Sequence, residues 1–341
     1  MNKNNTIILG IESSCDDTSA AILINGEIVS NIIANQDVHT EFGGVVPELA
    51  SRAHQQNIIP VVDAALKAAK INKTDLSAIA FTRGPGLLGS LIVGTCFSKS
   101  LALALNIPLI EVNHMQGHVL AHFIKNKTNT YPKFPFICLT VSGGHTQIVL
   151  IKDYFDMEIV GETIDDAAGE AFDKAAKIMG LPYPGGPLID KYAKGGDPKA
   201  FKFPISNLKD YNFSFSGLKT SLLYFLRKEV EKNPDFVTEN LADICASYQA
   251  TIIKSLFNKL VKATRALNIN HIAIAGGVSA NSLLRSELIR IGKQENWETY
   301  IPDFEFCTDN AGMIAIAGHF KFMRKEFVEQ DVTPNARLKI S

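Results

Sequence analysis

Cysteine is scarce in this sequence, and its few copies stand far apart. The 341-residue chain contains five cysteines, which are Cys15, Cys96, Cys138, Cys245 and Cys307. No two of them form a Cys-x-x-Cys pair, so the sequence indicates neither a disulfide framework nor a thiolate zinc site. We expect each cysteine to be a reduced side chain in a core.

Net charge is close to zero as well. A formal charge of −1 gives the chain no general attraction to nucleic acid. An RNA partner would therefore need a local basic patch or a helper subunit. Lys321, Arg324 and Lys325, on the last expected helix, are the candidates for such a patch.

Apolar residues make up 46% of the chain, but we find no run of them as long as the ~20 residues that cross a membrane. Residues 1–6 lead directly into the apolar stretch 7–9, without the apolar segment of a signal peptide. These patterns predict a cytoplasmic protein with no membrane partner. The length allows two domains, each with its own core.

Strand-like and helix-like segments alternate along the chain, which predicts an α/β fold. Apolar runs typical of strands occupy residues 6–12, 77–82, 108–112, 136–141, 271–275 and 297–301. Helical spacing of apolar residues covers residues 47–70, 87–105, 167–179, 187–194, 217–231, 241–267, 282–292 and 311–327. Asn25-Gly26, between two strand-like runs, predicts a tight hairpin.

A strand, a polar loop and a hairpin occur twice, at residues 6–33 and again at 136–162. This repeat predicts two duplicated lobes. Residues 126–135, rich in Lys, Thr, Asn and Pro, form the expected linker. We therefore divide the chain into an N-terminal lobe, residues 1–130, and a C-terminal lobe, residues 131–341.

His114 and His118 stand four residues apart in a stretch that we expect to be helical. At that spacing two side chains share one helix face, with Cβ atoms roughly 5–6 Å apart, and His122 extends the row by another turn. Two imidazoles so placed could bind one metal ion, and neutral imidazole suits zinc, iron, copper or nickel. The alternative is an ordinary pair of histidines on a helix, and the spacing alone does not decide between the two.

A metal bound by the two histidines would need a further ligand. Asp309 precedes the last expected helix and is either its N-cap or the missing carboxylate ligand. A zinc protease is disfavoured, because His-Glu-x-x-His needs a glutamate directly after the first histidine and Met115 stands there.

Two glycine-rich turns could bind an anion. Residues 142–146 (SGGHT) join two expected strands, and residues 276–281 (GGVSAN) lead from a strand into a helix. Glycine lets backbone N–H groups approach a phosphate closely, and a helix N-terminus favours negative charge. Each turn alone is a weak signal, but facing each other from two lobes they would form a nucleotide cleft.

Acidic residues near two helix starts have two interpretations. Asp165, Asp166 and Glu170 are explained by capping and by the dipole of the helix at 167–179. Asp173 lies further along that helix beside apolar side chains, and Asp190 lies one turn into the next helix. These last two are the better candidates for ligand contacts.

Several motifs occur together in the order found in one family. They are residues 10–18 (GIESSCDDT), the His114/His118 pair, and residues 141–146 (VSGGHT), 185–187 (GGP), 213–219 (FSFSGLK), 276–281 and 283–285 (LLR). From about residue 6 to residue 325 the chain closely resembles the bacterial tRNA threonylcarbamoyladenosine transferases. That family belongs to the actin-like, sugar-kinase-like ATPase superfamily and was once described as a sialoglycoprotease family. The resemblance implies two duplicated actin-like, ribonuclease-H-like lobes with a nucleotide cleft between them, and a last helix that packs back across the cleft.

The resemblance also implies a reaction. Threonylcarbamoyl-AMP, made by a separate synthase, would bind in the cleft. The N6 amine of adenosine 37, in tRNAs reading ANN codons, would attack its carbamoyl carbon and release AMP. The implied partners are tRNA, a paralogous subunit and a small ATPase.

The family's pattern implies site residues in this chain. The metal ligands would be His114, His118 and Asp309, holding one divalent ion per chain, with Fe2+ the first candidate and Zn2+ the second. The substrate contacts would be Thr140, Val141, Ser142, Gly143, Gly144, Asp173, Gly186, Asp190 and Asn281. Which side chain is catalytic stays open.

Two positions depart from the family's pattern. Gln116 stands between the histidines where a glutamate is common, and Asp17 replaces a common glutamate in the first loop.

Three rival functions are a small-molecule kinase of the same superfamily, a metalloprotease and a non-catalytic scaffold. Asp16, Asp17 or Asp173 could serve a kinase as its base, whereas the glycine turns argue against a scaffold.

Overall fold

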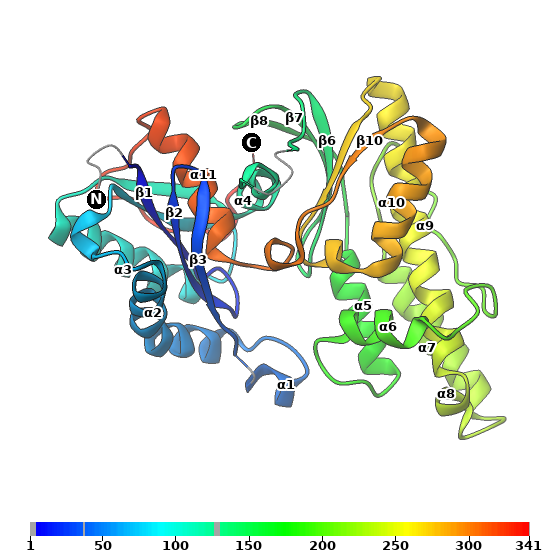
Figure 1. Ribbon diagram of the computed structural model, residues 1–341. Coiled ribbons are helices and arrows are strands. Elements are labelled where there is room, and N and C mark those ends of the chain that lie inside the picture. The colour runs from blue at the N-terminus through cyan, green and yellow to red at the C-terminus, as the bar shows by residue number, and fades with distance from the viewer. Residues whose placement is uncertain (1–4, 37, 126–129, 341) are drawn as a thin grey trace. The chain divides into compact units, whose positions relative to one another are not determined.

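The computed structural model describes residues 5–36, 38–125 and 130–340. Residues 126–129 of the expected linker lie outside these ranges. The chain forms two compact units, one made of residues 1–132 and 302–341, the other of residues 133–301. Each unit contains one five-stranded sheet with helices packed against it (Figure 1). The expected α/β fold is therefore confirmed.

The first sheet contains the strands β1 (Ile7–Glu12), β2 (Thr18–Ile24), β3 (Glu27–Ala34), β4 (Ala78–Gly84) and β5 (Leu109–Asn113). Their order is β3-β2-β1-β4-β5, with β1, β2 and β3 antiparallel and β4 and β5 added in parallel. The β2–β3 hairpin turns at Asn25 and Gly26, whose φ angles are 51° and 86°. Both positive values are those of the tight turn that the sequence predicts.

The second sheet repeats this topology. Its strands are β6 (Phe136–Val141), β7 (Thr146–Asp153), β8 (Asp156–Glu162), β9 (His271–Ala275) and β10 (Glu298–Tyr300). Their order is β10-β9-β6-β7-β8, with β6, β7 and β8 antiparallel and β9 and β10 parallel to β6. Read from β8, order and strand directions match those of the first sheet, so the predicted duplication is confirmed.

Helices cover both faces of the first sheet (Figure 1). Helices α2 (Pro47–Ala69), α3 (Leu88–Leu105), α4 (His114–Leu120) and α11 (Ala311–Met323) pack against its strands, whereas the short helix α1 (Val38–Phe42) lies away from the sheet. Side chains alternate along a strand, so Leu9 and Ile11 of β1 share a buried cluster with Ile58 of α2. Gly10 faces the other way, where a Cβ would collide with the Ala311 carbonyl oxygen. Helix α11 thus packs directly on the backbone of β1.

The position of α11 changes the expected domain boundary. The sequence assigns residues 131–341 to one lobe, but in the structure residues 302–341 belong to the first unit. Helix α11 also ends at Met323, so Arg324 and Lys325 follow it and do not lie within it. Lys321 is half-buried, and burial lowers the pKa of its ammonium group.

The second unit has its own helices and core. The helices are α5 (Ala168–Ile178), α6 (Gly185–Ala193), α7 (Ser216–Val230), α8 (Phe236–Glu239), α9 (Leu241–Leu267) and α10 (Ser282–Glu295). The core includes Phe172, Phe213, Phe215 and Tyr248, all buried. The short helices α1 and α8 are not predicted from the sequence, because they are shorter than the window that periodicity requires.

Helix α3 corrects the expectation about apolar runs. Among the described residues it is the one helix that is long and apolar enough to cross a membrane by length and composition, so the expectation that no such run exists is wrong. In the structure α3 packs against α2 and β4, and its Leu91 and Ala102 are buried. One third of α3 is buried within the described structure, and Leu88, Ile92 and Leu103 stay exposed.

Candidate functional site

Helix α4 begins where β5 ends, at Asn113. The side-chain oxygen of Asn113 accepts hydrogen bonds from the N–H groups of Met115 (2.9 Å) and Gln116 (3.2 Å), which makes Asn113 the N-cap. This cap starts the helix at His114, so His114 and His118 share one helical face. The helix ends at Leu120, and His122 lies in the 3-10 turn that follows (Ala121–Phe123). The expected row of three histidines is therefore reduced to a pair.

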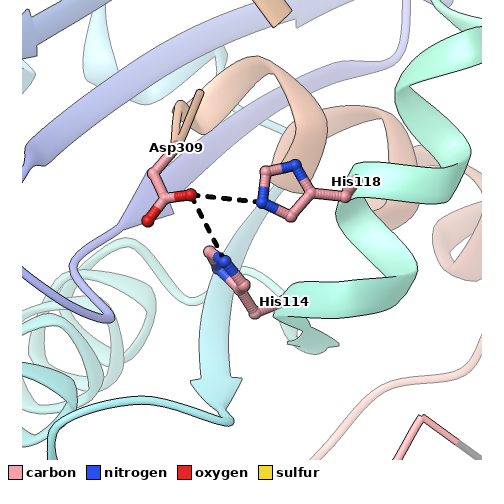
Figure 2. A group of neighbouring side chains, drawn as sticks. All are labelled: His114, His118 and Asp309. Atoms are coloured by element: carbon pink, nitrogen blue, oxygen red, sulfur yellow. Dashed lines mark hydrogen bonds and ion pairs between the residues drawn. The ribbon is translucent and has the colours of Figure 1, made fainter. Parts of the chain in front are cut away.

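The two histidines converge on Asp309 (Figure 2). Asp309 Oδ1 lies 3.1 Å from His118 Nε2 and 3.4 Å from His114 Nε2. Both histidines are buried, whereas the Asp309 side chain keeps 27% of its exposure. One ligand atom from each of the three residues lies within 4.8 Å of the other two. Two imidazole nitrogens and one carboxylate oxygen, so placed, fit a divalent metal and leave coordination positions open.

Asp309 does not cap helix α11. That position belongs to Asn310, whose side-chain oxygen accepts a hydrogen bond from Met313 N–H (3.0 Å). The Asp309 carboxylate instead points at the two histidines (Figure 2). The capping interpretation of Asp309 is therefore wrong, and its carboxylate lies where a ligand of a metal shared with the two histidines would have to lie.

Glu12 holds the other nitrogen of His114. Glu12 Oε2 lies 3.0 Å from His114 Nδ1 and accepts a hydrogen bond from Thr82 Oγ1 (2.6 Å). Its second oxygen accepts from the Ser14 N–H, and the side chain is fully buried. A carboxylate behind a ligating imidazole fixes the tautomer and the ring orientation. The Nδ1 atom of His118 is buried with no hydrogen-bond partner among the described residues, so only one of the two rings is held in this way.

The charges around His114 favour a cation. Burial alone would lower the pKa of His114, but the carboxylates of Asp309 and Glu12 outweigh it and raise that pKa well above 6.5. Burial alone would raise the pKa of Asp309, but His114 and His118 hold it well below 3.8. The pKa of Glu12 is also lowered, because His114 outweighs the effect of burial. Without a metal, a proton on His114 provides the positive charge that these carboxylates stabilise.

The first acidic loop, residues 13–17, lies beside this group. Burial, followed by the charges of Asp16, Asp309 and Glu12, raises the pKa of Asp17 to about 7. His54 of α2 fixes the loop, because one ring nitrogen donates to the Cys15 carbonyl (3.0 Å) and the other bonds Thr18 Oγ1 (2.7 Å). The loop thus places a further carboxyl group, that of Asp17, near the candidate metal ligands.

In the second unit, residues 142–145 form a tight turn after β6. Ser142 N–H donates to the His145 carbonyl (2.8 Å), and Ser142 Oγ accepts from the His145 N–H (3.1 Å). Gly143 and Gly144 are exposed, with no atom within 4 Å of a Cβ built on either. The backbone of this turn is therefore open to a ligand. The side chains of Thr140 and Val141 are buried, and both residues pair with neighbouring strands of the sheet.

Two other glycines bring neighbouring turns against the end of β6. Gly276 has a φ of 84°, and a Cβ there would lie 2.5 Å from the Val141 carbonyl oxygen. A Cβ on Gly169, at the start of α5, would collide with the Ser142 carbonyl. Only glycine permits such close approaches. The 142–145 turn, the start of α5 and the turn at 276–281 therefore lie together.

Asp173 and Gly186, both in the second unit, are joined by a hydrogen bond. Asp173 Oδ1 accepts hydrogen bonds from the N–H groups of Gly185 (2.8 Å) and Gly186 (3.3 Å), at the start of α6. The structure thus brings together two residues that the resemblance implies as substrate contacts. It also gives Asp173 a structural role, since the carboxylate satisfies two N–H groups of a helix terminus.

Asp190 and Asn281 meet at the start of α10. Asp190 accepts hydrogen bonds from Ser282 Oγ (2.6 Å) and Ser282 N–H (3.2 Å). The Asn281 side-chain oxygen caps α10, accepting from the Leu283 and Leu284 N–H groups at 3.0 Å. Its amide also donates to Gln249 Oε1 (2.7 Å). The two residues are neighbours, as a shared ligand would require, and both also support the fold.

Comparison with known sequences identifies the family. A family model for tRNA N6-adenosine threonylcarbamoyltransferase matches residues 27–316. The chain belongs to this family. The protein of that name from Christiangramia forsetii is 62% identical over 332 residues, which are 97% of this chain and 98% of the relative. The one from Riemerella anatipestifer is 60% identical over 336 residues, 98% of each chain.

Solved structures similar to this family member share its fold. HypF of T. kodakarensis aligns with a TM-score of 0.60 at 13% identity, covering 96% of this chain and 49% of that one. An activator of 2-hydroxyisocaproyl-CoA dehydratase from Clostridium difficile, solved with bound ADPNP, aligns with a TM-score of 0.51 at 15% identity, covering 95% and 98%. At such low identity these similarities show the fold alone.

Sequence reasoning assigned one acidic residue to the wrong helix. No side chain of the described residues caps α5, so the capping expectation for Asp165 and Asp166 is wrong. Asp166 accepts a hydrogen bond from Lys174 Nζ (2.6 Å). The Asp165 carboxylate accepts from Ser214 Oγ (2.5 Å) and from the N–H groups of Phe215 (2.8 Å) and Ser216 (3.3 Å), at the start of α7. This contact fixes the 213–219 motif. Sequence reasoning also missed Glu12 as a site residue, although an acid that ends an otherwise apolar strand was the available signal.

Proposed function

We propose that this protein transfers the threonylcarbamoyl group from threonylcarbamoyl-AMP to N6 of adenosine 37 in tRNAs that read ANN codons. The N6 amine attacks the carbamoyl carbon, the bond from that carbon to the adenylate phosphate oxygen breaks, and AMP leaves. The observation that carries the proposal is the 62% identity, over almost the whole of both chains, to a relative named for this transfer. The convergence of His114, His118 and Asp309 supports it.

We propose that these three residues hold one divalent metal, Fe2+ first and Zn2+ second. Imidazole nitrogen binds both metals, and a single carboxylate adds charge without filling the coordination sphere. When bound, the metal supplies a positive charge that can hold a phosphate or polarise the carbamoyl oxygen. The protein's part is to fix the ligand geometry, through the Asn113 cap and through Glu12 behind His114.

We propose that the adenylate binds the second unit at the residues implied by the family's pattern, Thr140 to Gly144, Asp173, Gly186, Asp190 and Asn281. The close approach of these turns, through Gly169 and Gly276, supports one shared ligand. Exposed glycine N–H groups at 143 and 144 suit a phosphate or carboxylate oxygen. Asp173 and Asp190 accept hydrogen bonds and would bind hydroxyl or amine groups.

The proposed partners are tRNA, a paralogous subunit and a small ATPase, acting in the cytoplasm. The net charge of −1 supports the need for help, because non-specific attraction to tRNA requires positive charge. Membership of the transferase family decides against the rival kinase and protease. Met115, at the position of a protease's glutamate, is itself buried in the core.

Reconstitution tests the proposed function. Purified protein would be mixed with threonylcarbamoyl-AMP and unmodified tRNA, with and without the partner proteins, and the tRNA digested to nucleosides for mass spectrometry. We expect threonylcarbamoyladenosine and released AMP in equal amounts, with the highest yield when the partners are present. Phosphorylation of a sugar or of acetate by ATP without tRNA, and no modified adenosine under any condition, would contradict the proposal.

A further inference from the structure

Residues 332–340, which we call the tail segment, lie along the edge of the first unit where β4 and β5 end. Four hydrogen bonds attach its first half: Lys99 Nζ to Val332 O (3.0 Å), Arg83 Nε to Thr333 O (3.0 Å), Asn335 N to Arg83 O (2.8 Å) and Gly86 N to Ala336 O (3.2 Å). At the end of β4 a Cβ on Gly84 would collide with the Asn335 carbonyl. The fit of the tail thus depends on a glycine in the sheet beneath it.

The second half of the tail segment ends on helix α4. Asn113 Nδ2 donates to the Lys339 carbonyl (2.7 Å), and Gln116 Nε2 donates to the Ile340 carbonyl (2.9 Å). The Ile340 side chain is buried, with 3% exposure. Both donors belong to the start of α4, where Asn113 is the cap and Gln116 lies between His114 and His118. The tail therefore contacts the turn that carries the candidate metal ligands.

We propose that Asn113 and Gln116 clasp the tail segment, and that the clasped tail positions α4 so that His114 and His118 are oriented for the metal. Gln116 is then a positioning residue that acts through the tail and the helix. The clasp needs amides, because a carboxylate at either position would face a carbonyl oxygen and could donate nothing. The positioning part rests on the proposed metal site, whereas the clasp itself does not.

Positioning through the tail has a reciprocal consequence. If a docked tail favours metal binding, a bound metal must protect the tail by the same factor. A tail that only stabilised the fold would gain no more protection from the metal than the rest of the first unit gains. Exchange of the tail's amide hydrogens, measured with and without metal, therefore separates a positioning role from a purely structural one.

The double variant Asn113→Asp/Gln116→Glu removes both hydrogen bonds of the clasp and keeps the size of the two side chains. Aspartate keeps the side-chain oxygen that caps α4 but lacks the donor to Lys339, and glutamate lacks the donor to Ile340. Both changes add negative charge near the ligands, which by itself would strengthen cation binding. Weaker binding could therefore not be attributed to charge. Gln55→Glu, at an exposed position of α2, makes the same chemical change away from the tail.

The experiment first compares hydrogen exchange of residues 332–340 in the metal-free proteins. We expect exchange about tenfold faster in the double variant, the scale of one or two lost hydrogen bonds, and unchanged exchange in Gln55→Glu. Zn2+ affinity, measured by competition with a chelator, should fall about tenfold in the double variant only. Zn2+ should also slow tail exchange in the wild-type protein. If the double variant fails to fold, Gln116→Glu, which leaves the cap intact, takes its place with a smaller expected effect.

The outcomes separate the two parts of the proposal. Unchanged tail exchange in the clasp variants would overturn the clasp. Faster exchange with unchanged Zn2+ affinity would overturn positioning, leaving the tail as a structural element only. A wild-type protein that binds neither Zn2+ nor Fe2+ would contradict the proposed metal site, and positioning with it, while the exchange of the metal-free proteins would still decide the clasp.

Discussion

Glu12 Oε2 lies 3.0 Å from His114 Nδ1, while Asp309 Oδ1 lies 3.4 Å from Nε2 of the same ring. One imidazole thus bridges a fully buried carboxylate and a partly exposed one. If the Nδ1 proton stays on the Glu12 side, the Nε2 lone pair is left for a metal. This relationship joins the end of β1 to the helix that carries the histidines.

Glu12→Gln should weaken metal binding about 10- to 100-fold, the range seen when a hydrogen-bonded partner of a ligating histidine is changed. Glutamine keeps the volume and can still bond Thr82, but it loses the charge that orients the His114 proton. Chelator competition measures the affinity. Glu27→Gln, on an exposed position of β3, is the matched control. Equal affinity in the two variants would show that Glu12 does not support the ligand.

Metal binding should weaken as the pH falls, starting at a higher pH than an ordinary histidine would cause. The metal needs neutral imidazole, and the pKa of His114 lies well above 6.5 in the metal-free protein because of Asp309 and Glu12. A proton therefore competes with the metal up to and above pH 6.5. Chelator competition across the range from about pH 6 to 8 measures this. A metal affinity that does not change over that pH range would contradict the raised pKa of His114.

The raised pKa of His114 affects the stability of the metal-free protein in the opposite direction, because stability falls as the pH rises. A raised pKa in the folded state gives stability that is fully present below 6.5, the ordinary pKa, and is lost as the pH rises through the folded value. The thermal midpoint of the metal-free protein should thus fall with rising pH, while the midpoint gain from added metal grows. The Asp309→Asn variant should show a smaller fall, because one of the carboxylates that raise the His114 pKa is neutral.

Asn281→Ala should lower both adenylate affinity and stability. Loss of an asparagine N-cap costs about 0.5–2 kcal/mol of unfolding free energy, and the bond to Gln249 is lost as well. Asn281→Asp keeps the cap and should recover most of the stability, so it is the better variant for calorimetry of adenylate binding. Full affinity in both variants would remove Asn281 from the proposed subsite.

The isolated protein should bind tRNA weakly. Of the three candidate basic residues, only Arg324 and Lys325 are exposed, which is a small patch against a net charge of −1. Charge reversal at both, Arg324→Glu/Lys325→Glu, should reduce tRNA affinity and flatten its salt dependence, as filter binding at several salt concentrations would show. Tight, strongly salt-dependent binding that survives the reversal would place the tRNA surface elsewhere.

Local patterns predicted much of this structure. Asn25-Gly26 predicts its hairpin because two successive positive φ angles demand such residues. The spacing of His114 and His118 places both on one face, since the helical period is local. Contacts between residues that are distant in the sequence were harder to predict. Asp309 and its neighbour Asn310 are both competent caps in sequence, and only the fold shows that Asn310 caps α11 while Asp309 meets histidines nearly 200 residues away.

The role of Gln116 could not be predicted from local sequence patterns either. In the sequence it is only a departure from a common glutamate. In the structure its amide meets the Ile340 carbonyl, a contact 224 positions apart, which no local pattern contains. The assignment of α11 to the first unit has the same cause, because a strand pattern does not reveal which distant helix covers it.

The central claim, that His114, His118 and Asp309 together hold the metal used in transfer, is tested most directly by the metal content of purified variants. Elemental analysis would compare the wild-type protein with His114→Ala, His118→Ala and Asp309→Ala, and with His271→Ala, a histidine of the second unit, as control. We predict one metal per chain in the wild type and in the control, and none in the other three. Full metal occupancy in His114→Ala or His118→Ala, in folded protein, would contradict the account and leave the two histidines as ordinary buried side chains.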